Sequence, residues 1–336
     1  MSHIQAFGVI ANPAAGRDLR RLVSWASVVT HADKVNTVLR LLGAAGALGL
    51  RQAWIMPDAS GLAARVRDQL DAARSAGHAD LPELRLLPLD VRGAVDDTRH
   101  AAAALHALGV GAIAVLGGDG THRAVAQSCG DTPLLTLSTG TNNAFPRLRE
   151  PTLAGMALAL YLRGEVPDTI ALQRNKLLQV RDAQRAEIAL VDVVVSRQRA
   201  LGARAVLDEA DVHTVYAAFA EPNAIGLSSI AAYATPVGRT DPWGAQVELG
   251  GARQLRAPLL PGALRTLGVL RTSRMLPGQP LRLPAMHGTL AFDGEREWVL
   301  DARQPPTITL QPDGPRTLQV EAILQHAAQA GLLCRA

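Results

Sequence analysis

A single carboxylate lies between glycines at residues 117–121, which read GGDGT and begin at the last residue of the apolar run GAIAVLG (111–117). The run predicts a buried strand that ends in a tight turn, and Thr121 is suited to cap a following helix. Glycine accepts positive φ and lets backbone N–H groups come close to a ligand, and a helix N-terminus favours phosphate. Asp119 fits beside phosphate only if Mg²⁺ lies between them or if the carboxylate accepts a hydroxyl proton. The alternative is a structural turn in which Asp119 caps the local backbone.

Two further polar loops follow predicted strands. NPAAG (12–16) follows the strand of residues 6–12, and STGTNNAFP (138–146) follows the strand of residues 133–138. Hydroxyl and amide groups gathered in one loop suit a ribose or a phosphate, although each loop taken alone is an ordinary turn. Because parallel strands open their carboxyl ends at one edge of a sheet, we expect all three loops to converge there.

The elements that must position these loops alternate through the first half of the chain. The strands are expected at 6–12, 51–57, 83–89, 111–117 and 133–138, and the helices at 17–29, 34–46, 60–77 and 97–109, with a short helix from Thr121. Alternation of this kind predicts parallel βαβ units. The first domain is therefore expected to be an α/β, Rossmann-like domain over residues 1–150.

The pattern changes after about Leu160. Runs of β type at 186–196, 226–234, 245–259 and 288–300 are separated by turn residues, which predicts a β-rich, sandwich-like domain over 151–315. Residues 316–336 contain an amphipathic stretch (319–333) that predicts a C-terminal helix packed back on the first domain. We place the domain boundary near 146–168, where prolines flank one helix.

Composition excludes several classes of protein. A chain of 336 residues that is 48% apolar and 19% charged suits two folded domains, and its net charge of +4 is small. The arginines are scattered and the only lysines are Lys34 and Lys176, so no nucleic-acid surface is expected. Cys129 and Cys334 have no disulfide or metal-ligand pattern. No signal peptide or long apolar run is found, so we expect a cytoplasmic protein without stable membrane insertion.

At these loops the sequence resembles the superfamily of the NAD kinases and the diacylglycerol and sphingosine kinases, whose shared signature is GGDGT. NPAAG and GTNNAF (140–145) resemble the NPxxG and GTGNDF loops of the lipid-kinase branch, and Asp293-Gly294-Glu295 resembles its DGE element. ALVDVV (189–194) and TPVGRT (235–240) resemble ALNEVV and TPTGST of the NAD kinases. The combination is most similar to the ATP-NAD kinase-like proteins called acetoin-catabolism protein X.

The resemblance implies an ATP-dependent kinase that transfers a phosphoryl group to a hydroxyl acceptor, with ATP and Mg²⁺ as cofactors. It implies a site in the cleft between the domains, NAD or a related small molecule as acceptor, a link to acetoin catabolism, and a homo-oligomer formed through the β-rich domain. Asp119 and Asp293 are the implied catalytic residues. The implied nucleotide ligands are Asn12, Gly117, Gly118, Gly120, Thr121, Thr141, Asn142 and Asn143. The implied acceptor or metal-linked residues are Asp192, Thr235, Gly238 and Glu295.

Two departures from the family keep other functions open. Val191 replaces the asparagine that hydrogen-bonds a ribose in NAD kinases, and Ala144 replaces a carboxylate of the lipid-kinase loop. Both departures suit a non-catalytic nucleotide- or NAD-binding regulator, which is the first alternative. A lipid kinase is the rival enzyme, although Ala144 departs from its loop.

Several other polar residues have no assigned role. His122, Arg20 and Arg21 could reach phosphate or could lie on solvated helix faces. His213 and His287 lack metal-binding partners in the sequence. The GxSxG, GxGxxG and Walker patterns are absent, which argues against hydrolases, ordinary dehydrogenases and P-loop NTPases.

Overall fold

The computed structural model describes residues 6–13, 15, 25, 29–140, 143–199 and 209–334. Within them, a seven-stranded sheet has the order β3-β2-β1-β4-β5-β17-β6. Strands β1 to β5 pair in parallel, and β17 pairs parallel to β5 and antiparallel to β6. The strand bounds are Ala6–Ala11 for β1, Gln52–Ile55 for β2, Glu83–Leu86 for β3, Ile113–Gly117 for β4, Leu134–Ser138 for β5, Leu172–Arg174 for β6 and Arg316–Leu318 for β17.

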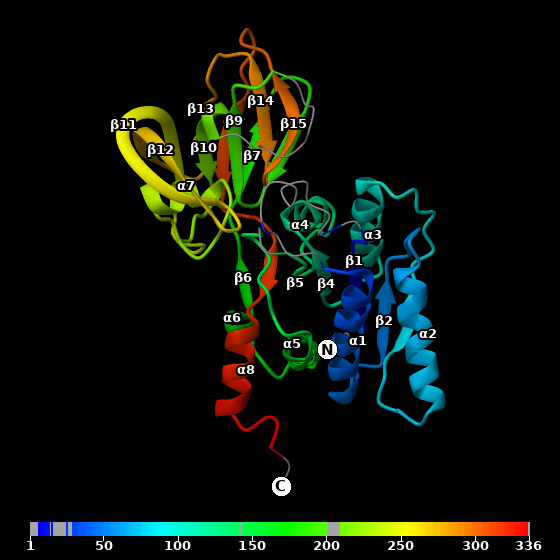
Figure 1. Ribbon diagram of the computed structural model, residues 1–336. Coiled ribbons are helices and arrows are strands. Elements are labelled where there is room, and N and C mark those ends of the chain that lie inside the picture. Colours follow the sequence, from blue (N-terminus) through cyan, green and yellow to red (C-terminus); the bar gives the residue numbers. More distant parts are fainter. Residues whose placement is uncertain are drawn as a thin grey trace.

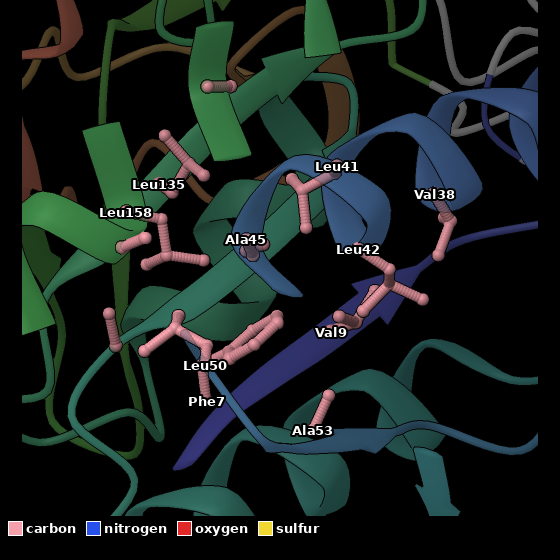
Figure 2. Close-up of a cluster of buried hydrophobic side chains, with 14 of the residues drawn as sticks. Phe7, Val9, Val38, Leu41, Leu42, Ala45, Leu50, Ala53, Leu135 and Leu158 are labelled. Atoms are coloured by element: carbon pink, nitrogen blue, oxygen red, sulfur yellow. The ribbon is translucent and has the colours of Figure 1, made fainter. Parts of the chain in front are cut away.

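Helices cover this sheet, and their buried side chains form an apolar core with those of the strands. They are α1 (His31–Ala47), α2 (Leu62–Ser75), α3 (Val95–Ala107), α4 (Asp119–Ala126), α5 (Pro151–Leu162), α6 (Asp168–Ala171) and α8 (Val320–Gln329). A capping box between Thr30 and Asp33 starts α1. Figure 2 shows Val38, Leu41 and Leu42 of α1, at helical spacing, beside Phe7 and Val9 of β1 in one buried cluster.

The second domain is built from two antiparallel sheets, β12-β11-β10-β9-β14-β15 and β13-β16-β7-β8. An apolar core that includes Val193, Tyr216 and Leu290 from the first of these and Val180 and Ile308 from the other lies between them. The bounds are Leu177–Arg181 for β7, Ala186–Ala189 for β8, Asp192–Ser196 for β9, Val212–Ala217 for β10, Gly244–Leu260 for β11, Ala263–Met275 for β12, Leu281–Arg282 for β13, Gly288–Phe292 for β14, Glu295–Leu300 for β15 and Thr307–Gln311 for β16, with a 3₁₀ turn at Glu209–Asp211.

One β-type run of the second domain is a helix. Residues 226–234 were expected to be extended, but α7 spans Ser228–Ala234 and packs on the long β11–β12 hairpin, which curls away from the rest of the domain in Figure 1. The prediction was wrong because a short apolar run has no periodicity that separates strand from helix, and its alanines favour the helix. The run 186–196 is divided into β8 and β9 at Leu190 and Val191. The expected helix over 17–29 lies largely outside the described residues.

The chain passes from the first domain to the second between β6 and β7. Helices α5 and α6 precede this passage and belong to the core of the first domain, and α8 returns to pack on both of them (Figure 1). The crossing therefore follows the proline-flanked helix that we took as the boundary region. Strand β17 also lies in the first sheet, so the end of the chain completes the first domain.

Candidate functional site

The loops that follow β1, β4 and β5 meet at the carboxyl edge of the first sheet. Asn12 after β1 donates its side-chain amide to Thr121 Oγ1 at 2.9 Å. Asp119 after β4 accepts backbone N–H groups from the loop after β5, at 3.0 Å from Ala144 and 2.8 Å from Phe145. The structure thus brings together three of the sequence segments that the resemblance assigns to a nucleotide.

These contacts explain the carboxylate between glycines. Asp119 starts α4, yet its acceptor atoms serve backbone amides 25 and 26 residues further along the chain. It is therefore neither a local cap nor a wholly free acid. The residue is partly exposed at the first turn of α4, where a helix has backbone donors without partners inside the helix.

The glycines of this turn are needed for space. A Cβ atom at Gly117 would lie 2.5 Å from Cβ of Thr121, and one at Gly118 would lie 2.9 Å from Oδ1 of Asn143. The φ of Gly118 is −93°, and neither glycine has a positive φ. The sequence argument from positive φ was wrong here, whereas the argument from close approach holds.

Asn143 and Lys34 fix the two flanking loops. Asn143 donates to Ser138 Oγ at 2.8 Å at the end of β5. The buried ammonium of Lys34 donates to the backbone carbonyls of Asn12 (3.2 Å), Pro13 (2.6 Å) and Ala15 (2.6 Å). The other two predicted ligands of this region, Thr141 and Asn142, lie outside the described residues, as do Arg20 and Arg21.

Asp293 occupies a different environment from Asp119. Its side chain is 0% exposed, and it accepts backbone N–H groups from Leu190 (3.1 Å), Val191 (2.8 Å) and Asp192 (3.3 Å). Its φ is +50°, the left-handed region that few residues other than glycine adopt. Burial raises the pKa of Asp293 to about 7, although the nearby Arg123 guanidinium and the amides act in the opposite direction. The carboxyl group fixes the β14–β15 turn to the β8–β9 junction.

Helix α4 belongs to the first domain and contacts the second domain through side chains. Arg123 lies 5% exposed on it, forms an ion pair with Glu297 of β15 and lies 3.9 Å from Asp293. Gln127, just after the helix, donates to Glu187 of β8. His122 is fully buried, with Nδ1 donating to the Gly118 carbonyl at 2.9 Å. Burial lowers the pKa of His122 to about 4, so the ring is neutral and lies on neither a phosphate nor a solvated face.

The four residues predicted to bind the acceptor or a metal belong to the second domain. Glu295 begins β15, with its carboxylate 3.6 Å from where a Cβ of Gly120 would stand, so it reaches the first turn of α4. Asp192 is buried at the start of β9, and its N–H donates to Asp293. Thr235 ends α7, and Gly238 donates its N–H to Asp241 at 2.8 Å in the loop that follows.

Sequence reasoning assigned no role to Arg239 and Lys176. Arg239 reaches the first domain and donates to the Ala144 carbonyl, while Lys176 donates to the loop that carries Arg239. Two signals were available. Arg239 stands where the similar TPTGST motif has serine, and Lys176 is one of only two lysines in a chain rich in arginine.

The described residues show neither a metal-binding cluster nor a membrane-spanning helix. That part of the chain contains no group of three or more His, Cys, Asp or Glu side chains arranged to hold a metal ion. None of its helices combines the length and the apolar character needed to cross a bilayer.

The two domains match two family models. Residues 10–166 match the ATP-NAD kinase N-terminal domain, and residues 176–313 match the Acetoin catabolism protein X C-terminal domain. The first match gives the chain an NAD kinase-like first domain of α/β type, and the sheets described above add an antiparallel β-rich second domain. The predicted fold class is confirmed.

A close relative in sequence identifies the family to which the whole chain belongs. The Acetoin catabolism protein X of Cupriavidus necator is 43% identical over 335 residues, which covers 97% of this chain and 93% of that protein. The chain belongs to the acetoin catabolism protein X family, so the resemblance inferred from the sequence is confirmed. The crystal structure of an NAD kinase from Archaeoglobus fulgidus in complex with ATP is 13% identical, covers 82% of this chain and 96% of its own, and has a TM-score of 0.40.

Proposed function

We propose that the protein is an ATP-dependent kinase that transfers a phosphoryl group to the hydroxyl of a small molecule. The observation that carries the proposal is the convergence of the loops after β1, β4 and β5, joined by the Asn12–Thr121 and Asp119–Ala144 hydrogen bonds. Phosphoryl transfer depends on positioning and on charge neutralisation more than on covalent chemistry. An edge built from three loops that are hydrogen-bonded to one another provides such positioning.

The residues at this edge fit the phosphates of ATP and a magnesium ion. The first turn of α4 offers backbone N–H donors and the positive end of the helix dipole, and Gly120 places no side chain over this turn. Mg²⁺ bound to phosphates usually takes one or two carboxylates from the protein. Glu295, whose carboxylate lies beside Gly120, would hold it. The metal ion would neutralise the charge of the phosphates.

We assign the role of general base to Asp119. Asp119 is a partly exposed residue at the edge of the sheet, and two amides of the 143–145 loop hold its carboxylate in place. Asp293 has no exposed side-chain surface and is surrounded by three amides, so it cannot contact a substrate in this arrangement. We assign Asp293 to the positioning of Glu295, two residues later in the same turn.

The acceptor that we propose is NAD or a related small hydroxyl compound, including hydroxyketones of the acetoin type. The alternatives are a lipid acceptor and a nucleotide-binding regulator without catalysis. The regulator is favoured by Val191, which is 1% exposed and part of the apolar core between the two sheets of the second domain, at the position where related NAD kinases bind a ribose.

The test is the release of ADP from Mg-ATP in the presence of NAD, small polyols, acetoin and diacylglycerol, with Asp119→Asn as the paired variant. We expect release that depends on one class of acceptor, and a fall of about 10²- to 10⁴-fold in Asp119→Asn with a normal melting temperature. Wild-type turnover in that variant would contradict the role of Asp119. Tight nucleotide binding without ADP release on any acceptor would favour the regulator.

A further inference from the structure

Lys176 lies at the point where the chain crosses between the domains, between β6 of the first sheet and β7 of the second domain. Its buried ammonium donates to three carbonyl oxygens, those of Gly238 (3.1 Å), Asp241 (2.7 Å) and Trp243 (2.7 Å). The three donors of an ammonium group match three converging carbonyls, whereas the planar fork of arginine does not. This explains a lysine here in a chain that otherwise uses arginine.

The backbone beneath Lys176 is fixed to the first domain. The adjacent Asn175 is 2% exposed and donates its side-chain amide to the Pro315 carbonyl (2.8 Å) and to Thr317 Oγ1 (3.0 Å). Thr317 belongs to β17 of the seven-stranded sheet. Lys176 therefore holds the loop 238–243 relative to the first sheet, which is the sheet whose edge carries the candidate site.

Arg239 extends from that loop to the candidate site. It donates Nε to Glu221 at 3.2 Å, its guanidinium lies 4.1 Å from the centre of the Phe219 ring, and it also donates to the Ala144 carbonyl. The N–H of Ala144 in turn donates to Asp119. One peptide segment is thus held from both sides, by Arg239 at its carbonyl and by Asp119 at its amide.

We propose that Lys176 and Arg239 are positioning residues for Asp119: Lys176 fixes the loop 238–243, and Arg239 uses that support to hold the 143–145 segment against the Asp119 carboxylate. The part of this proposal that concerns turnover depends on the proposed kinase function. The part that concerns the 143–145 segment does not.

The test measures amide hydrogen exchange at Ala144 and Phe145 in the full chain, for the wild type, Lys176→Met and Arg239→Met. We expect exchange at these two amides to rise at least tenfold in both variants. Lys34→Met is the matched control because it removes the same ammonium and three similar carbonyl contacts from the loop after β1. It should raise exchange near Ala15 and leave Ala144 and Phe145 within about twofold of the wild type.

Unchanged exchange at Ala144 and Phe145 in a folded Lys176→Met or Arg239→Met protein would overturn the proposal, and so would an equal rise in Lys34→Met. If Lys176→Met does not fold, Arg239→Lys decides, because it retains the charge but loses the paired contacts with Glu221 and Ala144. Should the wild type turn over, kcat in Arg239→Lys is expected to fall about 100-fold with KM for ATP within threefold. Should the wild type release no ADP, the kinase function fails, and the exchange result still decides the proposal.

Discussion

Asp119 and Asp293 both belong to motifs shared with related kinases, and backbone amides surround them to different degrees. Two amides hold the carboxylate of Asp119, which is a partly exposed residue, whereas Asp293 accepts three amides and its side chain is fully buried. A buried carboxylic acid with a raised pKa has a measurable effect on stability, because the folded and unfolded chains then bind different numbers of protons.

The pH dependence of stability tests the environment of Asp293. Its pKa of about 7 in the fold lies above the ordinary value of 3.8, so the folded chain binds more protons between about pH 4 and pH 7. The contribution of this group is therefore full below pH 4 and is lost as the pH rises to 7. His122 acts in the opposite direction, because its pKa is lowered from 6.5 to about 4. Stability from His122 rises with pH over that window.

Asp293→Asn should remove only the first of these two effects. The free energy of unfolding in urea is measured at pH 5 and at pH 7.5 for both proteins. The wild type loses the Asp293 contribution between these values and the variant does not, so the change should be more positive in the variant by on the order of 2 kcal/mol. The asparagine oxygen can still accept amides from the β8–β9 junction. Identical pH profiles for the two proteins would show that Asp293 does not titrate in this range.

Gly118 and Gly120 form a matched pair within one turn. Gly118→Ala places a methyl group 2.9 Å from Asn143 Oδ1, which must move, whereas in Gly120→Ala the nearest atom is at an ordinary 3.6 Å from Glu295. We expect Gly118→Ala to lower the free energy of unfolding by about 1–3 kcal/mol and Gly120→Ala to change it by less than about 1 kcal/mol. Thermal or urea unfolding measures both. Equal effects would contradict the close packing of Asn143 on Gly118.

At the scale of elements, the contact between α1 and α5 provides a second matched pair. A Cβ atom at Gly155 of α5 would overlap the Leu41 carbonyl of α1, while one at Gly43 of α1 would meet no atom within 4 Å. Alanine is favoured over glycine in a helix by about 1 kcal/mol. Gly43→Ala should therefore raise the melting temperature and Gly155→Ala should lower it, as calorimetry can measure. A gain in both would mean that the two helices are not in close contact.

The helices and strands of the structure show which parts of the fold could be predicted from the sequence. The five parallel strands and the meeting of their loops follow from alternation and from the rule that parallel strands open at one edge. Strand β17 could not be predicted, because three residues near the end of the chain pair with β5 only through tertiary contacts. The sequence marks Lys176 and Arg239 as unusual residues, but it could not predict their contacts, since carbonyls that converge in space leave no spacing in the sequence. The division of the predicted strand 186–196 into β8 and β9 at Leu190 and Val191 depends likewise on hydrogen bonds to Asp293, about 100 residues away.

At the scale of the whole molecule, α4 belongs to the first domain, and its Arg123 makes polar contacts with the second domain. Removing the Arg123 guanidinium would leave Glu297 and Asp293 without their cation, and breaking a buried ion pair in this way typically costs about 3–5 kcal/mol. We expect the wild type to unfold in one calorimetric transition and Arg123→Met to unfold in two, as the domains separate.

The control for that experiment is Arg271→Met. Arg271 pairs with Glu248 at 3.0 Å on the exposed β11–β12 hairpin, where a surface pair contributes about 0–1 kcal/mol. It should retain the single transition. A single transition in Arg123→Met would contradict the role of α4 as the connection between the domains.

The predicted homo-oligomer stays a prediction, which sedimentation equilibrium of the wild type can test.

The most direct test of the central claim is a crystal structure with a non-hydrolysable ATP analogue and Mg²⁺. We predict electron density for the triphosphate over the first turn of α4, between Asn12, Gly118 and Asn143, with the metal beside Glu295. A nucleotide bound on another surface, with these three loops unchanged and no ligand between them, would contradict the claim that they form a phosphate-binding site.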